Sequence, residues 1–290
     1  MTEEFVGPGL SIVIPAKNEA AAIGKIVAAA LAEFPAAEII VVDDGSTDDT
    51  AAIARSAGAN VFVHPESLGN GAAIKSGARA ATGEFLAFMD GDGQHDAREF
   101  RKLMDKLEDG YEMVVGARDS GSHASFGRLF ANGFYNALAS RLSNRRVLDL
   151  TSGFRIARAS LFREFLYLLP NGFSYPTTIT MAFLRSGYPV HFETVAVGSR
   201  EGSSHIRPVR DGLRFLVIIF KIATLYAPLK IFVPVSGLFM ATGLGWYVYT
   251  YLMSGRFTNM SVLLISASVI VFLIGLISEQ ITALTYSKSG

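Results

Sequence analysis

Two long stretches near the C-terminal end of the chain contain no charged residue, and they limit what the chain can fold into. They cover residues 231–255 and 257–278. Each exceeds the roughly 20 apolar residues that cross about 30 Å of hydrocarbon, and aromatic residues crowd one end of the first, at 246–251, as in an interfacial belt. Because the connection at 254–260 is short, we expect a transmembrane hairpin. The alternative, a pair of buried core helices, is disfavoured because neither stretch has a polar face for water.

The basic residues around the hairpin predict its orientation. Five of them precede the first stretch: Arg207, Arg210, Arg214, Lys221 and Lys230. Lys288 follows the second stretch, and the connection contains only Arg256. The positive-inside rule then predicts a multi-pass protein of the cell (inner) membrane whose N-terminal domain and C-terminus are cytoplasmic. The first residues, MTEEFVGPG, lack the pattern of a signal peptide, which agrees with this topology.

Composition excludes several classes of function. The chain has 26 basic and 26 acidic residues, so a nucleic-acid partner is not expected. It has no cysteine, which excludes disulfides, zinc–thiolate sites, iron–sulfur clusters and a thiol nucleophile. The five histidines do not form a metal-ligand set, and we interpret His64, His123 and His191 as incidental.

Before residue 205, short apolar runs alternate with segments of helical periodicity. We predict strands at 10–15, 38–42, 60–64, 84–89 and 112–117, and helices at 20–34, 47–57, 71–81 and 97–108. Ser46 or Thr47 is the expected cap of the second helix. This alternation predicts an α/β domain with a mainly parallel sheet covered on both faces. In such sheets ligands bind beyond the carboxyl ends of the strands, and polar clusters follow three of the predicted strands, at 15–19, 43–44 and 90–92.

The third cluster places the carboxylates of Asp90 and Asp92 in one tight turn. Their repulsion favours a shared cation. Hard oxygen ligands of this kind suit Mg²⁺ or Mn²⁺, which usually also bridges substrate phosphates. Taken alone, the turn could equally be an Asx-rich turn with capping carboxylates. The two other clusters at predicted strand ends favour the metal site.

A set of segments resembles the inverting family 2 glycosyltransferases with the GT-A fold. In chain order they are LSIVIPAKNE, VVDDGSTDDT, NGAAIKSGARAATGE and MDGDGQH. The further segments VVGAR, DLTSGFR and REGSS, followed by two apolar stretches, are similar to the polyprenyl-phosphate glycosyltransferase branch, which contains dolichyl-phosphate mannose synthase. The resemblance covers nearly the whole chain and implies a hexosyltransferase, but it does not specify the sugar.

The resemblance implies residues for the donor and the metal. The nucleotide-sugar, UDP- or GDP-linked, would be bound by Pro15, Glu19, Asp43, Lys75, Asp90 and Asp92, with Lys75 near the diphosphate. The metal, Mg²⁺ or Mn²⁺, would be held by Asp90, Asp92 and Gln94. The chain departs from the family at Lys17, where relatives often carry an aromatic residue, and this leaves the identity of the base open.

The acceptor side is predicted from an apolar helical pattern and from arginines. Apolar residues recur near helical period at Phe126, Leu129, Phe130, Phe134, Leu138 and Leu142, with arginines around them. This pattern indicates an amphipathic interface helix at about 126–144, or alternatively a surface helix packed on the sheet. By resemblance, Arg118, Arg128 and Arg200 would bind the acceptor phosphate, with Asn132 nearby; a guanidinium fits a phosphate geometrically. For each arginine the alternative is a surface ion pair.

Asp149 and Asp90 are the expected catalytic carboxylates. Transfer to a hydroxyl needs a base, whereas a phosphate monoester, with a second pKa near 6, is largely dianionic at neutral pH. We therefore expect Asp149 to orient or polarise the reacting groups, or to act as a base only toward a singly charged phosphate. The alternative is a loop carboxylate that pairs with Arg155.

These expectations combine into one organisation. A GT-A catalytic domain occupies 1–205, a juxtamembrane interface helix 206–228, and two transmembrane helices 229–254 and 260–286. The predicted activity is inverting transfer of one sugar from a nucleotide-sugar to a polyprenyl phosphate at the cytoplasmic membrane face. A homo-oligomer formed through the hairpin is a further expectation. Two alternatives stay open: a family 2 enzyme that acts on a hydroxyl acceptor in cell-surface polysaccharide synthesis, and an inactive membrane scaffold that binds nucleotides.

Overall fold

The computed structural model of the chain describes residues 9–118, 126–172, 174–196, 224 and 226–287. The chain divides into two compact units, Met1–Ile206 and Arg207–Gly290, and each is described by itself. Of the predicted juxtamembrane helix at 206–228, only 224 and 226–228 lie within the described residues.

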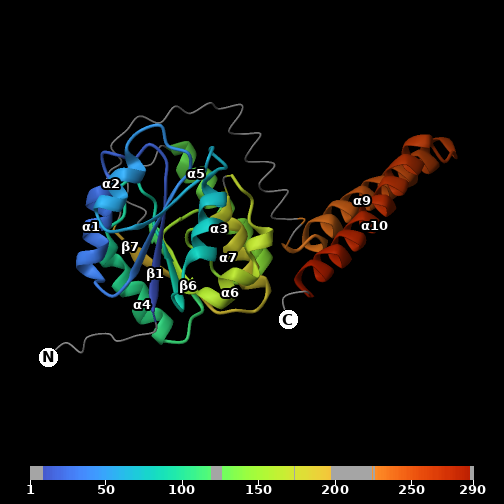
Figure 1. Cartoon of the computed structure of the whole chain (residues 1–290). Coiled ribbons are helices and arrows are strands. Elements are labelled where there is room, and N and C mark those ends of the chain that lie inside the picture. The colour runs from blue at the N-terminus through green and yellow to red at the C-terminus, as the bar shows by residue number, and fades with distance from the viewer. Residues whose placement is uncertain (1–8, 119–125, 173, 197–223, 225, 288–290) are drawn as a thin grey trace. The chain divides into compact units, whose positions relative to one another are not determined.

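The N-terminal unit is built on a seven-stranded sheet with the order β3-β2-β1-β4-β6-β5-β7 (Figure 1). Its strands are β1 Leu10–Ala16, β2 Glu38–Asp43, β3 Asn60–Val63, β4 Phe85–Phe88, β5 Met113–Arg118, β6 Arg155–Arg158 and β7 Val190–Val195. Among the described strands only β6 runs antiparallel to its neighbours, β4 and β5, and every other pair is parallel. The prediction of a mainly parallel α/β sheet is therefore confirmed.

Helices cover both faces of this sheet. The N-terminal unit contains α1 Ile23–Glu33, α2 Thr50–Ser56, α3 Asn70–Ala80, η1 Ala97–Glu99, α4 Phe100–Glu108, α5 Phe126–Ser143, α6 Ala159–Glu164, η2 Leu166–Leu168 and α7 Tyr175–Arg185. Figure 1 shows α1, α2 and α4 on one face and α3, α6 and α7 on the other. Because central strands are buried on both faces, their sequences are nearly continuous apolar runs, as in the fully buried β1.

The expected cap of α2 is wrong. The helix begins at Thr50, and the carboxylate of Asp48 accepts the Thr50 backbone N–H at 3.1 Å. Ser46 and Thr47 are used elsewhere: the Ser46 hydroxyl accepts the Asn18 N–H at 2.9 Å, and the Thr47 N–H is donated to the Asn18 side chain at 2.8 Å. These two residues tie the loop after β2 to the loop after β1, so they do not cap the helix.

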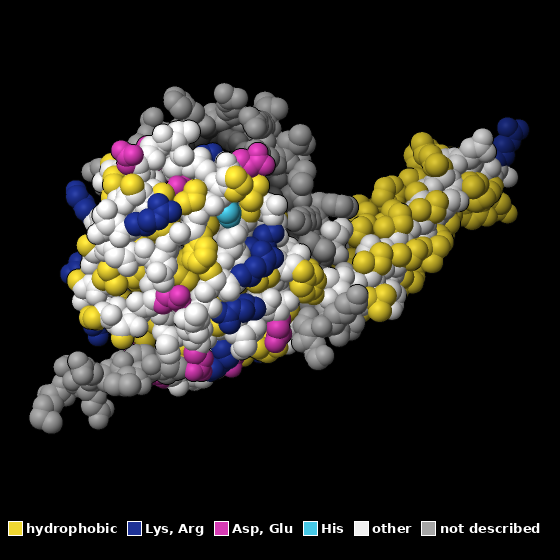
Figure 2. Space-filling view, in the orientation of Figure 1, with side chains coloured by type: hydrophobic (Ala, Val, Ile, Leu, Met, Phe, Trp, Pro, Cys, Tyr) yellow, Lys and Arg dark blue, Asp and Glu magenta, His cyan; other side chains and the backbone are white. Residues whose placement is uncertain are grey.

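The C-terminal unit contains a helical hairpin formed by α9 Leu229–Ser254 and α10 Asn259–Ser287. Both helices are long and apolar enough to cross a membrane, by length and composition. Polar groups join the two helices at the serines, where the hydroxyls of Ser236 and Ser268 each donate to the other's backbone carbonyl at 2.9 Å, and at the start of α9, where the Leu229 N–H is donated to the Glu279 carboxylate at 3.5 Å. The outward-facing side chains are largely apolar (Figure 2), with Leu252 77% exposed. The hairpin thus has a largely apolar exterior, and these polar contacts lie between its two helices.

Candidate active site

The sheet brings four predicted site residues to one edge. Asp43 ends β2, Asp90 follows β4 and Arg118 ends β5. These strands are mutually parallel, so their carboxyl ends share an edge. Because β6 is antiparallel, the residues that precede it, including Asp149, lie at the same edge. Ligands of open α/β sheets bind at this edge.

The loops after β1 and β2 are fastened to each other. Pro15 is buried in β1 opposite Val42, and the half-buried Glu19 follows in the loop. The Glu19 N–H is donated to the Thr50 hydroxyl at 2.9 Å. Asn18, which makes the contacts to Ser46 and Thr47, has a φ of 57°, a left-handed conformation that asparagine tolerates better than most residues. The predicted nucleotide-binding loops are therefore held in one arrangement.

Asp44 organises a network that the sequence interpretation missed. Its buried carboxylate accepts hydrogen bonds from the backbone N–H groups of Leu68 and Gly69 and from the Ser67 hydroxyl, and it contacts the His64 Nδ1 at 2.8 Å. Burial raises the pKa of Asp44, but these four contacts outweigh it and the net pKa is lowered. His64 therefore has a structural role in this network, and its interpretation as incidental to metal binding stays a prediction. In the sequence, the two adjacent aspartates of VVDDGS were the feature that could have predicted this network.

The acidic turn after β4 is packed against β1. A Cβ added at Gly91 would lie 3.1 Å from the Pro15 carbonyl oxygen. Asp90, Asp92 and Gln94 are half-buried, and the Asp92 Oδ1 accepts the Gln94 backbone N–H at 3.1 Å. Carboxylate and amide oxygens are ligands that suit Mg²⁺ or Mn²⁺. Within the described ranges no three His, Cys, Asp or Glu side chains are grouped to hold a metal.

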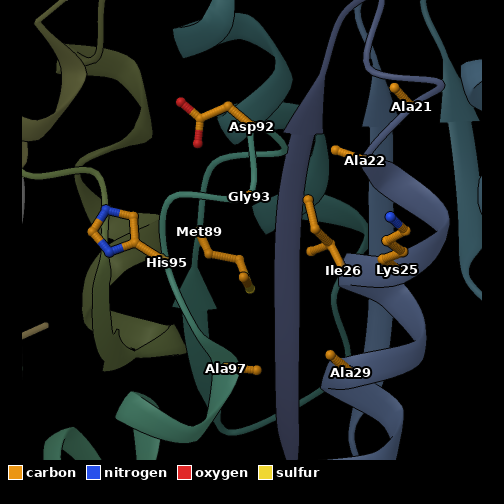
Figure 3. A pocket seen from close by; sticks show the side chains of 10 residues that line it. All are labelled: Ala21, Ala22, Lys25, Ile26, Ala29, Met89, Asp92, Gly93, His95 and Ala97. Carbon is orange, nitrogen blue, oxygen red and sulfur yellow. The ribbon is translucent and has the colours of Figure 1, made fainter. Parts of the chain in front are cut away.

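A cavity of about 330 Å³ lies between α1 and this turn (Figure 3). It is lined by Ala21, Ala22, Lys25, Ile26, Ala29, Met89, Asp92, Gly93, His95 and Ala97. His95 stacks on Phe154 with ring centroids 4.7 Å apart, and its Nδ1 is buried with no hydrogen-bond partner among the described residues. Burial lowers the pKa of His95, although the charges of Asp92 and Asp149 raise it. A neutral imidazole therefore borders the acidic turn at pH 7.

Asp149 and Arg118 form a forked ion pair. The Arg118 Nε lies 2.8 Å from one carboxylate oxygen and its terminal nitrogen 3.1 Å from the other. Burial raises the pKa of Asp149, but the guanidinium and the N–H and hydroxyl of Thr151 lower it below its ordinary value. Asp149 thus pairs with Arg118, and the alternative pairing with Arg155 is wrong because Arg155 is buried among other partners. A carboxylate held ionised in this way is a weak base and is suited to orienting the guanidinium.

Lys75 is directed to a different loop. Its ammonium group donates to the Leu169 carbonyl at 3.2 Å and to the Asn171 side chain. The same loop covers the start of α3, where a Cβ at Gly71 would lie 2.0 Å from the Pro170 carbonyl oxygen. Burial lowers the pKa of Lys75, and the charge of Arg79 adds to this. In this structure the expected contact with a diphosphate would require Lys75 to exchange these partners.

The predicted acceptor helix is present as α5. Its buried residues within the described part are Tyr135, Ala139 and Leu142, while Phe134 of the predicted apolar stripe is 46% exposed. The apolar residues are therefore divided between the protein interior and the surface. The side chains of Arg128 and Asn132, and all of Arg200, lie outside the described residues.

The fold and the acidic turn define the class: this is a GT-A glycosyltransferase. More narrowly, the chain belongs to Glycosyl transferase family 2, whose family model matches residues 11–167. A second family model, the GtrB C-terminal hairpin, matches residues 227–284. That match and the two apolar helices indicate association with a membrane.

Curated relatives agree with the predicted branch. Glycosyltransferase AglJ of Haloferax volcanii is 28% identical over 245 residues, which cover 82% of this chain and 80% of the relative. Dolichyl-phosphate hexose transferase of the same organism is 28% identical over 211 residues (72% and 91%). Dodecaprenyl-phosphate galacturonate synthase of Rhizobium johnstonii is 31% identical over 166 residues (53% and 49%). The resemblance to the polyprenyl-phosphate branch is thereby confirmed at the level of relatives.

Solved structures share the fold. Glucosyl-3-phosphoglycerate synthase from Mycobacterium tuberculosis, in complex with Mn²⁺ and uridine-diphosphate-glucose, aligns with a TM-score of 0.60 at 25% identity and covers 76% of this chain and 79% of its own. Mannosyl-3-phosphoglycerate synthase from Rubrobacter xylanophilus aligns with a TM-score of 0.55 at 19% identity and covers 74% of each chain. The GT-A fold of the N-terminal unit is thereby confirmed.

Proposed function

We propose that this enzyme transfers one sugar from a nucleotide-sugar to a polyprenyl phosphate with inversion at the anomeric carbon. The observation that carries the proposal is the meeting, at one sheet edge, of the Asp90–Asp92 turn and the Arg118–Asp149 pair in a chain that also has an apolar hairpin. Relatives named for dolichyl-phosphate and dodecaprenyl-phosphate chemistry support the acceptor class.

The donor would lie over the carboxyl ends of β1, β2 and β4. Pro15, Glu19 and Asp43 are the proposed nucleotide residues, and the fastened loops around them support a preformed pocket. Lys75 is the proposed diphosphate residue, once it leaves the 169–171 loop. A fold neighbour that was solved with uridine-diphosphate-glucose supports a nucleotide-sugar donor, UDP- or GDP-linked.

The oxygen donors of the turn fit a divalent cation. Asp90, Asp92 and Gln94 are the proposed ligands of Mg²⁺ or Mn²⁺, in keeping with the Mn²⁺ of that neighbour. When bound, such a cation supplies positive charge for the leaving diphosphate. Asp90 thereby contributes to catalysis through its carboxylate.

The acceptor phosphate would be bound by guanidinium groups. Of the residues proposed to bind this phosphate, Arg118 has a described side chain. The others are Arg128, Asn132 and Arg200, whose side chains lie outside the described residues. Asp149 orients Arg118 through two hydrogen bonds. A dianionic phosphate oxygen forms the new bond to the anomeric carbon while the bond to the diphosphate oxygen breaks, so no proton has to be removed. Asp149 is therefore proposed as a positioning residue.

The hairpin would anchor this reaction at a bilayer. We propose a catalytic domain at 1–205, an interface helix at 206–228 and membrane-spanning helices at 229–254 and 260–286. The apolar exteriors of α9 and α10 support spanning, and the distribution of basic residues supports a cytoplasmic catalytic domain in the cell membrane. Holding the acceptor in the plane of the membrane converts a two-body encounter into a positioned one.

The test is transfer from a panel of radiolabelled UDP- and GDP-sugars to a short-chain polyprenyl phosphate, with Mn²⁺ or Mg²⁺ and the full chain in detergent. We expect a labelled product that extracts into organic solvent with one donor of the panel. Asp92→Asn should reduce the rate of its formation by about 100-fold or more. This corresponds to a loss of about 2.8 kcal/mol of transition-state stabilisation, because each 1.4 kcal/mol changes the rate about tenfold. Asp105→Asn, a matched change at an exposed aspartate of α4, should leave the rate unchanged.

Each alternative predicts a different result. Label that enters only water-soluble or insoluble polysaccharide would indicate a hydroxyl acceptor and overturn the proposal. Binding of a nucleotide-sugar by calorimetry, without turnover on any acceptor, would indicate an inactive scaffold. Transfer by Asp92→Asn at the parent rate would refute the metal site.

A further inference from the structure

Arg155 is a buried cation that the proposed mechanism does not use. Its side chain, in β6, is 0% exposed. One guanidinium nitrogen donates to the Pro176 carbonyl at 3.0 Å and the Thr180 hydroxyl at 2.9 Å and lies 3.9 Å from the Met113 sulfur; the other donates to the Ser152 carbonyl. The Nε is buried with no partner among the described residues. All of the described hydrogen-bond partners of Arg155 are therefore neutral.

A buried guanidinium without a carboxylate contact is costly. Removing a charge from water costs several kcal/mol even after the protein relaxes, and a close counter-ion normally offsets this cost. Burial lowers the pKa of Arg155, whereas Tyr175 and then the charges of Asp149 and Asp90 raise it. The carboxylates that act on this cation are thus those of the proposed active site, although neither is a hydrogen-bond partner.

The contacts of Arg155 hold the segment that carries Asp149. The Ser152 carbonyl accepts from its guanidinium, and the Tyr175 hydroxyl donates to the Gly153 carbonyl at 3.2 Å. The ring of Tyr175 lies 5.7 Å from the Arg155 guanidinium carbon. The segment in turn touches the acidic turn, since a Cβ at Gly153 would lie 3.0 Å from the Asp90 carboxylate. The Arg155 side chain therefore anchors the backbone at residues 152–153, which lies between the carboxylates of Asp149 and Asp90.

We propose that Arg155 is a positioning residue that serves as the internal counter-cation of the active site. Its fixed positive charge behind Asp90 and Asp149 offsets their mutual repulsion, and its hydrogen bonds hold residues 149–153 in place. The charge also favours the negatively charged phosphates of donor and acceptor over a bare metal ion. The inference rests on the proposed function for the identity of these substrates, but the charge effect can be measured without turnover.

A charge role and a packing role predict opposite changes in the affinity for Mn²⁺, although both predict weaker binding of UDP. Arg155→Met keeps an unbranched apolar stem and removes the charge. We expect Mn²⁺ alone to bind more tightly, and UDP without metal to bind more weakly, each by about three- to tenfold, the size of a screened charge interaction across a protein site. A packing role alone would loosen the site and weaken both. Electron paramagnetic resonance measures Mn²⁺ binding, and calorimetry measures UDP binding.

Two further variants complete the test. Arg155→Lys keeps a charge without the fork, and we expect it to restore the parent Mn²⁺ and UDP affinities more fully than it restores transfer. Arg158→Met is the matched control: Arg158 also lies in β6, but it pairs with Glu112 at 2.6 Å and Glu84 at 2.7 Å. This control should change neither affinity.

The outcomes separate this inference from the proposed function. Weaker binding of both probes to Arg155→Met, or unchanged binding of both, overturns the inference. A parent enzyme without transfer to polyprenyl phosphate overturns the proposed function but leaves the opposite shifts in Mn²⁺ and UDP affinity intact. Should Arg155→Met fail to fold, Arg155→Lys decides: parent affinities support the charge role, and a joint loss of both affinities refutes it.

Discussion

At the scale of single residues, the site is a balance of buried charges. Asp149 is 6% exposed, yet it stays ionised because Arg118 and Thr151 donate to its carboxylate. Asp44 is similarly buried and is satisfied by four donors from the 64–69 segment. Buried carboxylates of this kind stabilise the fold only while they are deprotonated.

The ionised carboxylate of Asp149 should stabilise the fold, and Asp149→Asn tests this. The folded-state pKa of Asp149 lies below its ordinary value of 3.8, so the folded protein binds fewer protons there than the unfolded chain. Its contribution is therefore fully present above that value and is lost as the pH falls through the lower folded pKa. At pH 7 we expect Asp149→Asn to reduce the free energy of unfolding by about 1.5–3 kcal/mol, the net worth of hydrogen bonds to a charged group. Denaturant titrations at a series of pH values measure this.

The difference between parent and Asp149→Asn should shrink as the pH is lowered below about 4, where the unfolded aspartate is protonated. Asp105→Asn serves again as the exposed control. A difference that is constant from pH 7 to pH 3 would contradict the assignment of the stabilisation to the ionised carboxylate.

At the scale of elements, close backbone approach decides the packing of the hairpin. A Cβ at Gly275 of α10 would lie 2.6 Å from the Phe232 Cβ of α9, whereas nothing lies within 4 Å of a Cβ at Gly245. Small residues at contacts let membrane helices approach closely. The two glycines therefore differ in role although both lie in apolar helices.

We predict that Gly275→Leu destabilises the hairpin by about 1–3 kcal/mol through overpacking, and that Gly245→Leu is neutral. Trp246 in α9 is the chain's only tryptophan, so its fluorescence during titration with a denaturing detergent reports on this unit. Equal shifts in the two variants would mean that the helices do not meet at Gly275.

At the scale of the whole molecule, apolar surface is segregated. Most of the exposed large apolar side chains among the described residues belong to α9, α10 and their connection, while the N-terminal unit carries few of them. A soluble protein rarely exposes a continuous apolar surface of this kind. The C-terminal unit is therefore expected to lie in a bilayer.

The absence of cysteine makes the orientation testable. In cells that express Ser56→Cys, with the cysteine in α2, or Ser254→Cys, at the end of α9, a membrane-impermeant maleimide should label only Ser254→Cys until the membrane is permeabilised. The reason is the excess of basic residues on the side of the catalytic domain. Labelling of Ser56→Cys in intact cells would reverse the orientation, and the unsubstituted chain controls for background.

The sequence alone predicted the first five strands with the four helices between them, the mainly parallel sheet, the acidic turn and the two apolar helices. These follow from local periodicity and from residues close together in the chain. The tertiary structure alone decided the antiparallel insertion of β6, the pairing of Asp149 with Arg118 and the burial of Arg155 among neutral partners. Arg118 and Asp149 are 31 residues apart in the chain, and Arg155 and Thr180 are 25 residues apart. A local sequence pattern cannot predict such contacts, because they depend on how the strands and helices pack against one another.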